Sequence, residues 1–134
     1  RIEDWLSQRA RNYALLADAL EQFSDITVFP SEFGPAKSSP YCLNFVLPAD
    51  GSISRDTVQD ALAERGIGTS IHYPSAVPLY TYYRLKYGFD AGRFPVAEWL
   101  GRQTLSLPVG PHLGLEGVQQ IADATVETLQ RLIR

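Results

Sequence analysis

Two histidines carry most of the chemistry that this sequence offers. His72 is followed directly by Tyr73 and Pro74, at the expected end of a strand. Imidazole nitrogens and phenol hydroxyls donate and accept hydrogen bonds, so the pair suits sugar hydroxyls or a carboxylate. Strand ends that run into proline-rich loops often line binding sites. The plainer interpretations are a structural histidine at position 72 and an exposed loop residue at His112.

The two lysines are weaker candidates for chemistry than the histidines. A lysine that forms a Schiff base needs a desolvated pocket that lowers its pKa. Lys37 lies in a serine-rich loop and Lys86 among polar and aromatic residues before a glycine, so we expect both to be exposed. Lys86 shares its segment with a tyrosine cluster that suits a packing face, an aromatic wall or a dimer contact: Tyr80, Tyr82, Tyr83 and Tyr87.

Other catalytic patterns are missing. The sequence has no G-x-S-x-G nucleophile elbow and no defensible pair of carboxylates. Gly66-Ile67-Gly68 lacks the third glycine of a dinucleotide-binding loop, and a helix end is its plainer interpretation. Cys42 is the only cysteine, which excludes an internal disulfide and a cysteine zinc site. We therefore predict no catalytic residue and no metal ligand.

Composition narrows the class of protein further. The chain has 134 residues, with 12 Lys and Arg against 15 Asp and Glu, for a net charge of −3. This length fits one domain, and the mild acidity argues against a nucleic-acid partner. No apolar run approaches the roughly 20 residues that span a membrane. With one cysteine and no signal pattern, we expect a cytoplasmic protein.

Hydrophobic periodicity predicts alternating helices and short strands. Helices are expected where apolar residues recur every three or four positions: 1–23, 55–65, 78–87, 95–102 and 115–133. Strands are expected in short runs closed by proline or a turn: 26–29, 41–47, 68–73 and 105–107. Residues 30–40 are expected to form a loop. The order predicts an α+β fold, with a small, mostly antiparallel sheet of three to four strands covered by helices.

A series of short motifs runs through the chain in a fixed order. It comprises Arg9-x-x-Asn12-Tyr13, Arg55-Asp56, Gly66-Ile67-Gly68-Thr69, His72-Tyr73-Pro74, Pro78-Leu79, Phe94-Pro95-x-Ala97-Glu98 and Leu105-Ser106-Leu107-Pro108. The series resembles the C-terminal small domain of the DegT/DnrJ/EryC1/StrS family. These are pyridoxal-phosphate-dependent sugar aminotransferases of fold type I, and the resemblance covers essentially residues 1–134.

The resemblance implies an activity for a longer protein. Family members move an amino group from glutamate or glutamine to a keto sugar, usually nucleotide-linked, or to a keto-cyclitol, in polysaccharide or antibiotic sugar biosynthesis. They are typically homodimers, and their cofactor lysine lies in a large N-terminal domain. The sequence has no Met and starts at Arg1 within a predicted helix, which favours a fragment. Such a fragment is expected to be inactive and to bind no pyridoxal phosphate.

The resemblance also implies substrate contacts. His72 and Tyr73 match a His-Tyr pair that reaches the sugar in relatives. Tyr80 stands where the family often has a histidine after the Pro-Leu pair, and it is the third candidate substrate residue. Two alternatives stay open: a free-standing ligand-sensing or interaction module, and a relative that has kept the fold without catalysis. The gene sequence upstream of Arg1 separates the first alternative from the enzyme.

Overall fold

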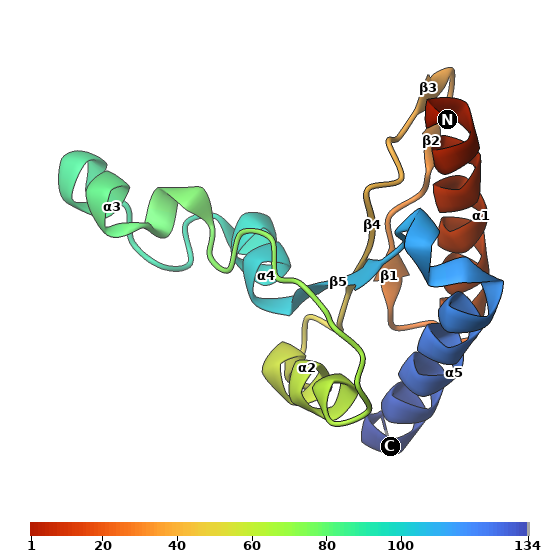
Figure 1. Cartoon of the computed structure of the whole chain (residues 1–134). Coiled ribbons are helices and arrows are strands. Elements are labelled where there is room, and N and C mark those ends of the chain that lie inside the picture. Colours follow the sequence, from red (N-terminus) through yellow and green to blue (C-terminus); the bar gives the residue numbers. More distant parts are fainter. Residues whose placement is uncertain (134) are drawn as a thin grey trace.

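Three antiparallel strands form the central sheet, in the order β1-β4-β5 (Figure 1). The computed structural model describes residues 1–133, except for the side chain of Phe33. The strands are β1 (Thr27–Val28), β4 (Cys42–Val46) and β5 (Thr104–Pro108). In β4 and β5, Cys42 pairs with Pro108 and Val46 with Thr104. The predicted α+β fold with a small antiparallel sheet is therefore confirmed.

Strand alternation gives the sheet one apolar and one more polar face. Leu43 and Phe45 are fully buried, whereas Cys42 and Asn44 point to the opposite face and stay partly exposed. Helices pack on the apolar face because their own apolar stripes need burial. These helices are α1 (Ile2–Leu20), α2 (Arg55–Ala63) and α5 (Gly114–Leu132).

The second half of the chain adds shorter helical elements. Their bounds are η1 (Val77–Leu79), α3 (Thr81–Tyr87), α4 (Pro95–Gln103) and η2 (Pro111–Leu113). The predicted helix over 78–87 is interrupted because Tyr80 adopts an extended backbone, with ψ of 145°. The predicted helix 1–23 ends at Leu20, while Gly88 ends α3 with φ of 66° as expected. Within residues 1–133, no helix is both long and apolar enough to cross a bilayer.

The predicted strand over 68–73 is wrong. Only Ser70 pairs with the sheet, through two backbone hydrogen bonds of 2.9 and 3.0 Å with Ser106 of β5. The chain then leaves the sheet because Tyr73 has φ of 61°, a left-handed conformation that no strand accommodates. His72 therefore sits on an irregular segment at the sheet edge.

The predicted loop over 30–40 contains a small hairpin. Its strands are β2 (Glu32–Phe33) and β3 (Ala36–Lys37). Gly34 and Pro35 connect them, and Gly34 adopts φ of 56°, which a two-residue hairpin loop with glycine first requires. With only two residues in each strand, no alternating pattern could reveal the hairpin in the sequence.

Candidate functional site

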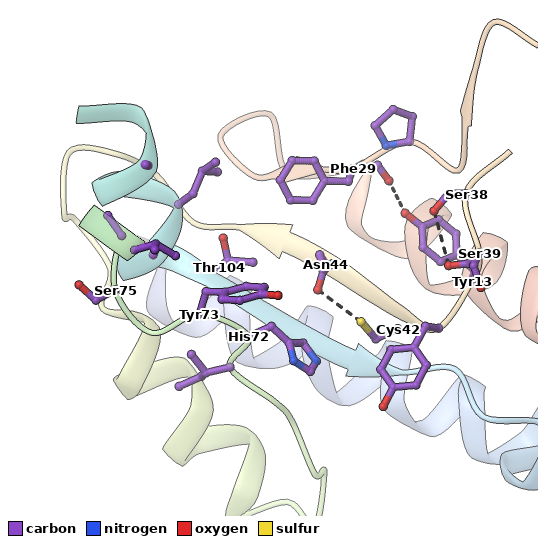
Figure 2. A pocket seen from close by; sticks show the side chains of 18 residues that line it. Tyr13, Phe29, Ser38, Ser39, Cys42, Asn44, His72, Tyr73, Ser75 and Thr104 are labelled. Atoms are coloured by element: carbon purple, nitrogen blue, oxygen red, sulfur yellow. Dashed lines mark hydrogen bonds between the residues drawn. The ribbon is translucent and has the colours of Figure 1, made fainter. Parts of the chain in front are cut away.

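A cleft of about 710 Å³ opens on the more polar face of the sheet (Figure 2). Its floor is formed by β4 and β5. One wall is the segment 71–77 with the adjoining residues of α4, and the other comes from the connection between β1 and β4. Of the residues that the structure describes, eighteen line it, and these include hydroxyl, amide, imidazole and phenol groups but no carboxylate and no lysine. Such a cleft suits a neutral or anionic polar ligand.

Asn44 lies at the centre of the floor. Its Oδ1 accepts hydrogen bonds from Ser106 Oγ at 2.5 Å and from Cys42 Sγ at 3.5 Å. The amide nitrogen donates to no other residue that the structure describes, so it remains available as a donor to a ligand. Sequence patterns did not single out this residue. A polar residue on the outer face of an apolar strand was the signal that could have found it.

His72 and Tyr73 both line the cleft, as Figure 2 shows. Tyr73 is 73% exposed, and the His72 ring centroid lies 6.3 Å from that of Tyr41. Tyr80, the third candidate, does not line the cleft and lies between η1 and α3. The structure thus brings together two of the three predicted substrate residues.

The backbone of Tyr73 is strained. A positive φ is rare for a bulky residue, and residues before proline normally prefer extended conformations. Strain of this kind costs on the order of 1–3 kcal/mol and is found most often at functional sites. It turns the chain sharply between His72 and Pro74, at the rim of the cleft. This outlier supports the assignment of the segment to a binding site.

Gly101 determines how closely the 71–77 segment approaches α4. A Cβ atom at position 101 would lie 3.0 Å from the nitrogen of Ala76 and 3.0 Å from the carbonyl carbon of Ser75. These are backbone atoms, so no side-chain rotation can relieve the contact. Glycine at position 101 therefore lets this wall of the cleft approach α4 without a shift of either backbone.

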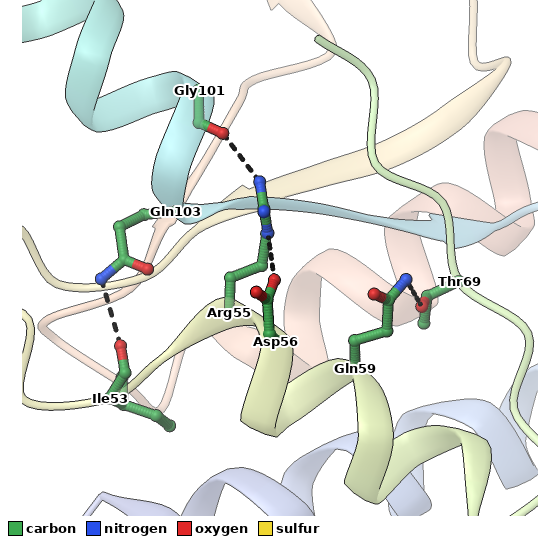
Figure 3. A network of polar contacts seen from close by, with 7 residues as sticks. All are labelled: Ile53, Arg55, Asp56, Gln59, Thr69, Gly101 and Gln103. Atoms are coloured by element: carbon green, nitrogen blue, oxygen red, sulfur yellow. Dashed lines mark hydrogen bonds and ion pairs between the residues drawn. The ribbon is translucent and has the colours of Figure 1, made fainter. Parts of the chain in front are cut away.

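Polar contacts hold the same wall from its other side (Figure 3). Arg55 Nη1 donates to the Gly101 carbonyl at 2.7 Å, and its Nε pairs with Asp56 at 3.0 Å. The buried Gln103 donates to the carbonyl of Ile53 at 3.1 Å. The Arg55-Asp56 motif of the sequence therefore ties the end of α4 to the start of α2.

Glu98 organises the turn before α4. This carboxylate is 4% exposed and accepts hydrogen bonds from the backbone N–H groups of Gly92 and Phe94, at 2.9 and 3.0 Å. These two hydrogen bonds hold the pKa of Glu98 below its ordinary value, and the bond from Gly92 contributes more than the bond from Phe94. Arg102 adds an ion pair at 3.6 Å. The motif residue Glu98 is thus structural.

Neither lysine reaches the cleft. Lys86 is exposed and donates to the Tyr82 hydroxyl at 3.0 Å, and the bonds to Tyr82 and then Tyr87 raise its pKa. Lys37 pairs with Glu32 at 3.6 Å on the hairpin. Both amines are exposed and paired with a neighbouring side chain, whereas a nucleophilic lysine needs a desolvated pocket. In the part of the chain that the structure describes, no three histidine, cysteine or acidic groups gather as metal ligands.

The chain resembles known proteins along nearly its whole length. The profile of the DegT/DnrJ/EryC1/StrS aminotransferase family matches residues 1–126. A 36% identical relative, the erythromycin biosynthesis sensory transduction protein EryC1 of Saccharopolyspora erythraea, is matched over 96% of this chain and 32% of its own length. The dTDP-3-amino-3,4,6-trideoxy-alpha-D-glucose transaminase of Streptomyces venezuelae is 40% identical over 78 residues, 58% of this chain and 20% of that one.

A solved structure shows the same fold. The crystal structure of S. venezuelae DesV in complex with a ketimine intermediate superposes with a TM-score of 0.80 and 29% identity, over 93% of this chain and 32% of DesV. The chain therefore spans about a third of the length of EryC1 and of DesV.

Replacing Gly101 with alanine tests the wall of the cleft. We expect Gly101→Ala to lower the free energy of unfolding by about 1–3 kcal/mol, because the new methyl meets backbone. Denaturant unfolding measures this. Gly117→Ala in α5 is the matched control, since its Cβ would meet only Leu113 Cβ at 3.7 Å. That variant should be as stable as the parent or more so. Equal stability of the two variants would contradict the proposed backbone contact.

The pH dependence of stability tests Glu98. Because its folded pKa is lowered, its stabilisation is complete above the unfolded pKa and disappears as the pH falls through the folded pKa. We expect Glu98→Gln to be less stable than the parent at neutral pH, with the difference shrinking as the pH falls from neutral through the acidic range. Denaturation midpoints across this range measure it. Glu64→Gln, at an exposed position, is the control, and a pH-independent difference for Glu98→Gln would refute the assignment.

Proposed function

Because this chain belongs to the DegT/DnrJ/EryC1/StrS aminotransferase family, we propose that residues 1–134 are the C-terminal small domain of a pyridoxal-phosphate-dependent sugar aminotransferase. In the complete enzyme, an amino group passes from glutamate or glutamine to a keto sugar, usually nucleotide-linked, or to a keto-cyclitol. The small domain lies on the substrate side of the active site, and the enzyme acts as a homodimer. The DesV likeness supports this proposal.

The observation that best supports this proposal is the cleft, with His72 and Tyr73 at its rim and Asn44 on its floor. Together they present an imidazole, a phenol and a carboxamide donor to one ligand, on a surface without a carboxylate. A sugar offers hydroxyls that need several such partners in a fixed arrangement. We assign to His72 and Tyr73 the orientation of the sugar, with no proton transfer at the reacting carbon.

The residues of this chain do not fit the role of cofactor holder. Pyridoxal phosphate supplies an electron sink when it is bound in such an enzyme. It needs a lysine in a desolvated site, whereas Lys37 and Lys86 are both exposed and paired, and neither lines the cleft. In our proposal the cofactor is held by the large domain, and the 134 residues alone are inactive.

One observation favours a second candidate. The relative from S. erythraea is named a sensory transduction protein, and the same cleft could bind a sugar without amino transfer. That reading corresponds to a ligand-sensing module or to a relative without catalysis. An amino-transfer assay on the two-domain protein separates these candidates from the enzyme.

Reductive trapping tests the absence of a cofactor lysine. At equimolar pyridoxal phosphate, borohydride reduction of the 134-residue chain should give no stoichiometric adduct, because neither amine is desolvated. Intact-mass spectrometry measures the adduct. A single full adduct that disappears in Lys86→Arg but not in Lys37→Arg would overturn the proposal.

Kinetics of the two-domain protein test the substrate contacts. We expect His72→Ala to lower kcat/KM for the sugar roughly tenfold, as for one lost hydrogen bond, and to leave pyridoxal phosphate affinity unchanged. Gln119→Ala, exposed on α5, serves as the control variant. If sugar kinetics stay at the parent level in His72→Ala, the site assignment fails.

A further inference from the structure

A second, smaller cavity of about 200 Å³ shares His72 with the cleft. It lies on the same face of the sheet, beside Arg9 of α1 and the Pro108 end of β5. Its polar lining comes from four separate parts of the chain: Arg9, Tyr41, Cys42, Ser70, His72, Ser106 and His112. Both histidines of the sequence therefore meet at one small cavity, although 39 residues separate them along the chain.

Arg9 is the fixed positive charge of this cavity. Its Nη1 donates to the Tyr41 carbonyl at 2.9 Å, and the guanidinium lies 5.8 Å from the centroid of the Tyr41 ring. No carboxylate pairs with Arg9 in the part of the chain described. An arginine is always charged and has five N–H donors, so several donors remain for a ligand.

The cavity wall around His112 is fixed by α1. Asn12, one turn after Arg9, is fully buried and donates to the carbonyls of Val109 and Gly110, at 3.3 and 3.2 Å. The His112 ring folds back on Gly110, where an added Cβ would lie 2.3 Å from its Cε1 atom. The helix α1 therefore fixes the positions of both Arg9 and the turn that carries His112.

The lining selects for negative charge. Its members within residues 1–133 include no aspartate and no glutamate, while a guanidinium, two imidazoles and the Ser70 hydroxyl can all donate hydrogen bonds. Several hydrogen-bond donors around one cavity suit a ligand with several acceptor oxygens. Charge-assisted hydrogen bonds from arginine to oxyanions are about twice as strong as hydrogen bonds between neutral groups. The small volume suits a single group such as a phosphoryl or a carboxylate.

We propose that this cavity is an oxyanion-binding subsite adjoining the sugar cleft. Arg9 supplies the charge, His112 and Ser70 supply directional donors, and His72 faces both spaces. A ligand that reaches from the cleft past His72 would place its anionic group here. The identity of this anionic group rests on the proposed function: it is a phosphoryl group of the nucleotide-linked sugar or a carboxylate of the amino donor. The binding of an oxyanion at this subsite does not depend on the proposed function.

Titration with inorganic phosphate, followed by NMR of this chain, tests the subsite. We expect shifts to concentrate on the imidazoles of His72 and His112 and on the Gly110 amide. Arg9→Gln should weaken phosphate binding roughly ten- to hundredfold, as for a lost charge-assisted hydrogen bond. Arg131→Gln, the same charge change on α5, should leave the affinity unchanged. Thermal melts of both variants check that the fold is intact.

Gly110→Ala provides a second variant that removes no polar group. Its methyl displaces the His112 ring, and a side-chain end can move at little cost to the fold, so phosphate should bind more weakly at unchanged stability. If phosphate binds equally well to Arg9→Gln, Arg131→Gln and Gly110→Ala, Arg9 only supports the backbone at Tyr41 and the proposal is overturned. Shifts confined to other residues would overturn it too.

Competition identifies the source of the oxyanion. Displacement of phosphate by a nucleoside diphosphate assigns the subsite to the phosphoryl groups, and displacement by glutamate assigns it to the amino donor. If neither the nucleoside diphosphate nor glutamate displaces phosphate, the link to the proposed substrates is wrong. The anion site itself is judged separately, by the effect of Arg9→Gln on phosphate binding. Loss of the aminotransferase activity proposed above would leave this binding experiment unaffected.

Discussion

The arrangement of the candidate site depends on one backbone contact, between Gly101 in α4 and the Ser75–Ala76 peptide. This contact, together with the hydrogen bond from Arg55 to the Gly101 carbonyl, joins α2, α4 and the segment that carries His72. The Ser70 bridge to β5 fixes the other end of that segment. A histidine on an irregular, exposed stretch of chain is therefore held between two anchored points. Functional groups gain from this, because misplacement by about 1 Å can cost on the order of a hundredfold in rate.

The helix α3 contrasts with this anchored region. None of its residues is buried, and in Figure 1 it projects away from the sheet on the side of α4. Aromatic rings within it contact one another, such as the stacked Tyr83 and Tyr87 rings at 6.3 Å, and Glu98 holds the turn between it and α4 through the Gly92 and Phe94 amides. Elements with few buried apolar contacts open at low free energy. The rigid part of the site is thus the sheet with α1, α2, α4 and α5.

Much of the fold could be predicted from periodicity. The apolar stripes of α1 and α5 and the alternation in β4 rest on repeated burial, which leaves a regular pattern. The segment 68–73 also alternates, but Tyr73 leaves the extended conformation, and a local pattern does not record that choice. Asn44 and Ser106 were missed as a pair because they lie 62 positions apart in the sequence, and only strand pairing brings them into contact.

The sequence by itself determined the fold class, the family and the exposure of both lysines, because these follow from local pattern, residue type and the order of motifs. It also singled out His72 and Tyr73, which line the cleft. The tertiary structure alone decided that Tyr80 stands apart from them, and that His112, Arg9 and His72 share one cavity. The reason is physical: such a convergence is set by strand register, by the Asn12 contacts with the turn before His112, and by a glycine that permits close packing. These contacts join residues that are distant in the chain, so no local pattern encodes them.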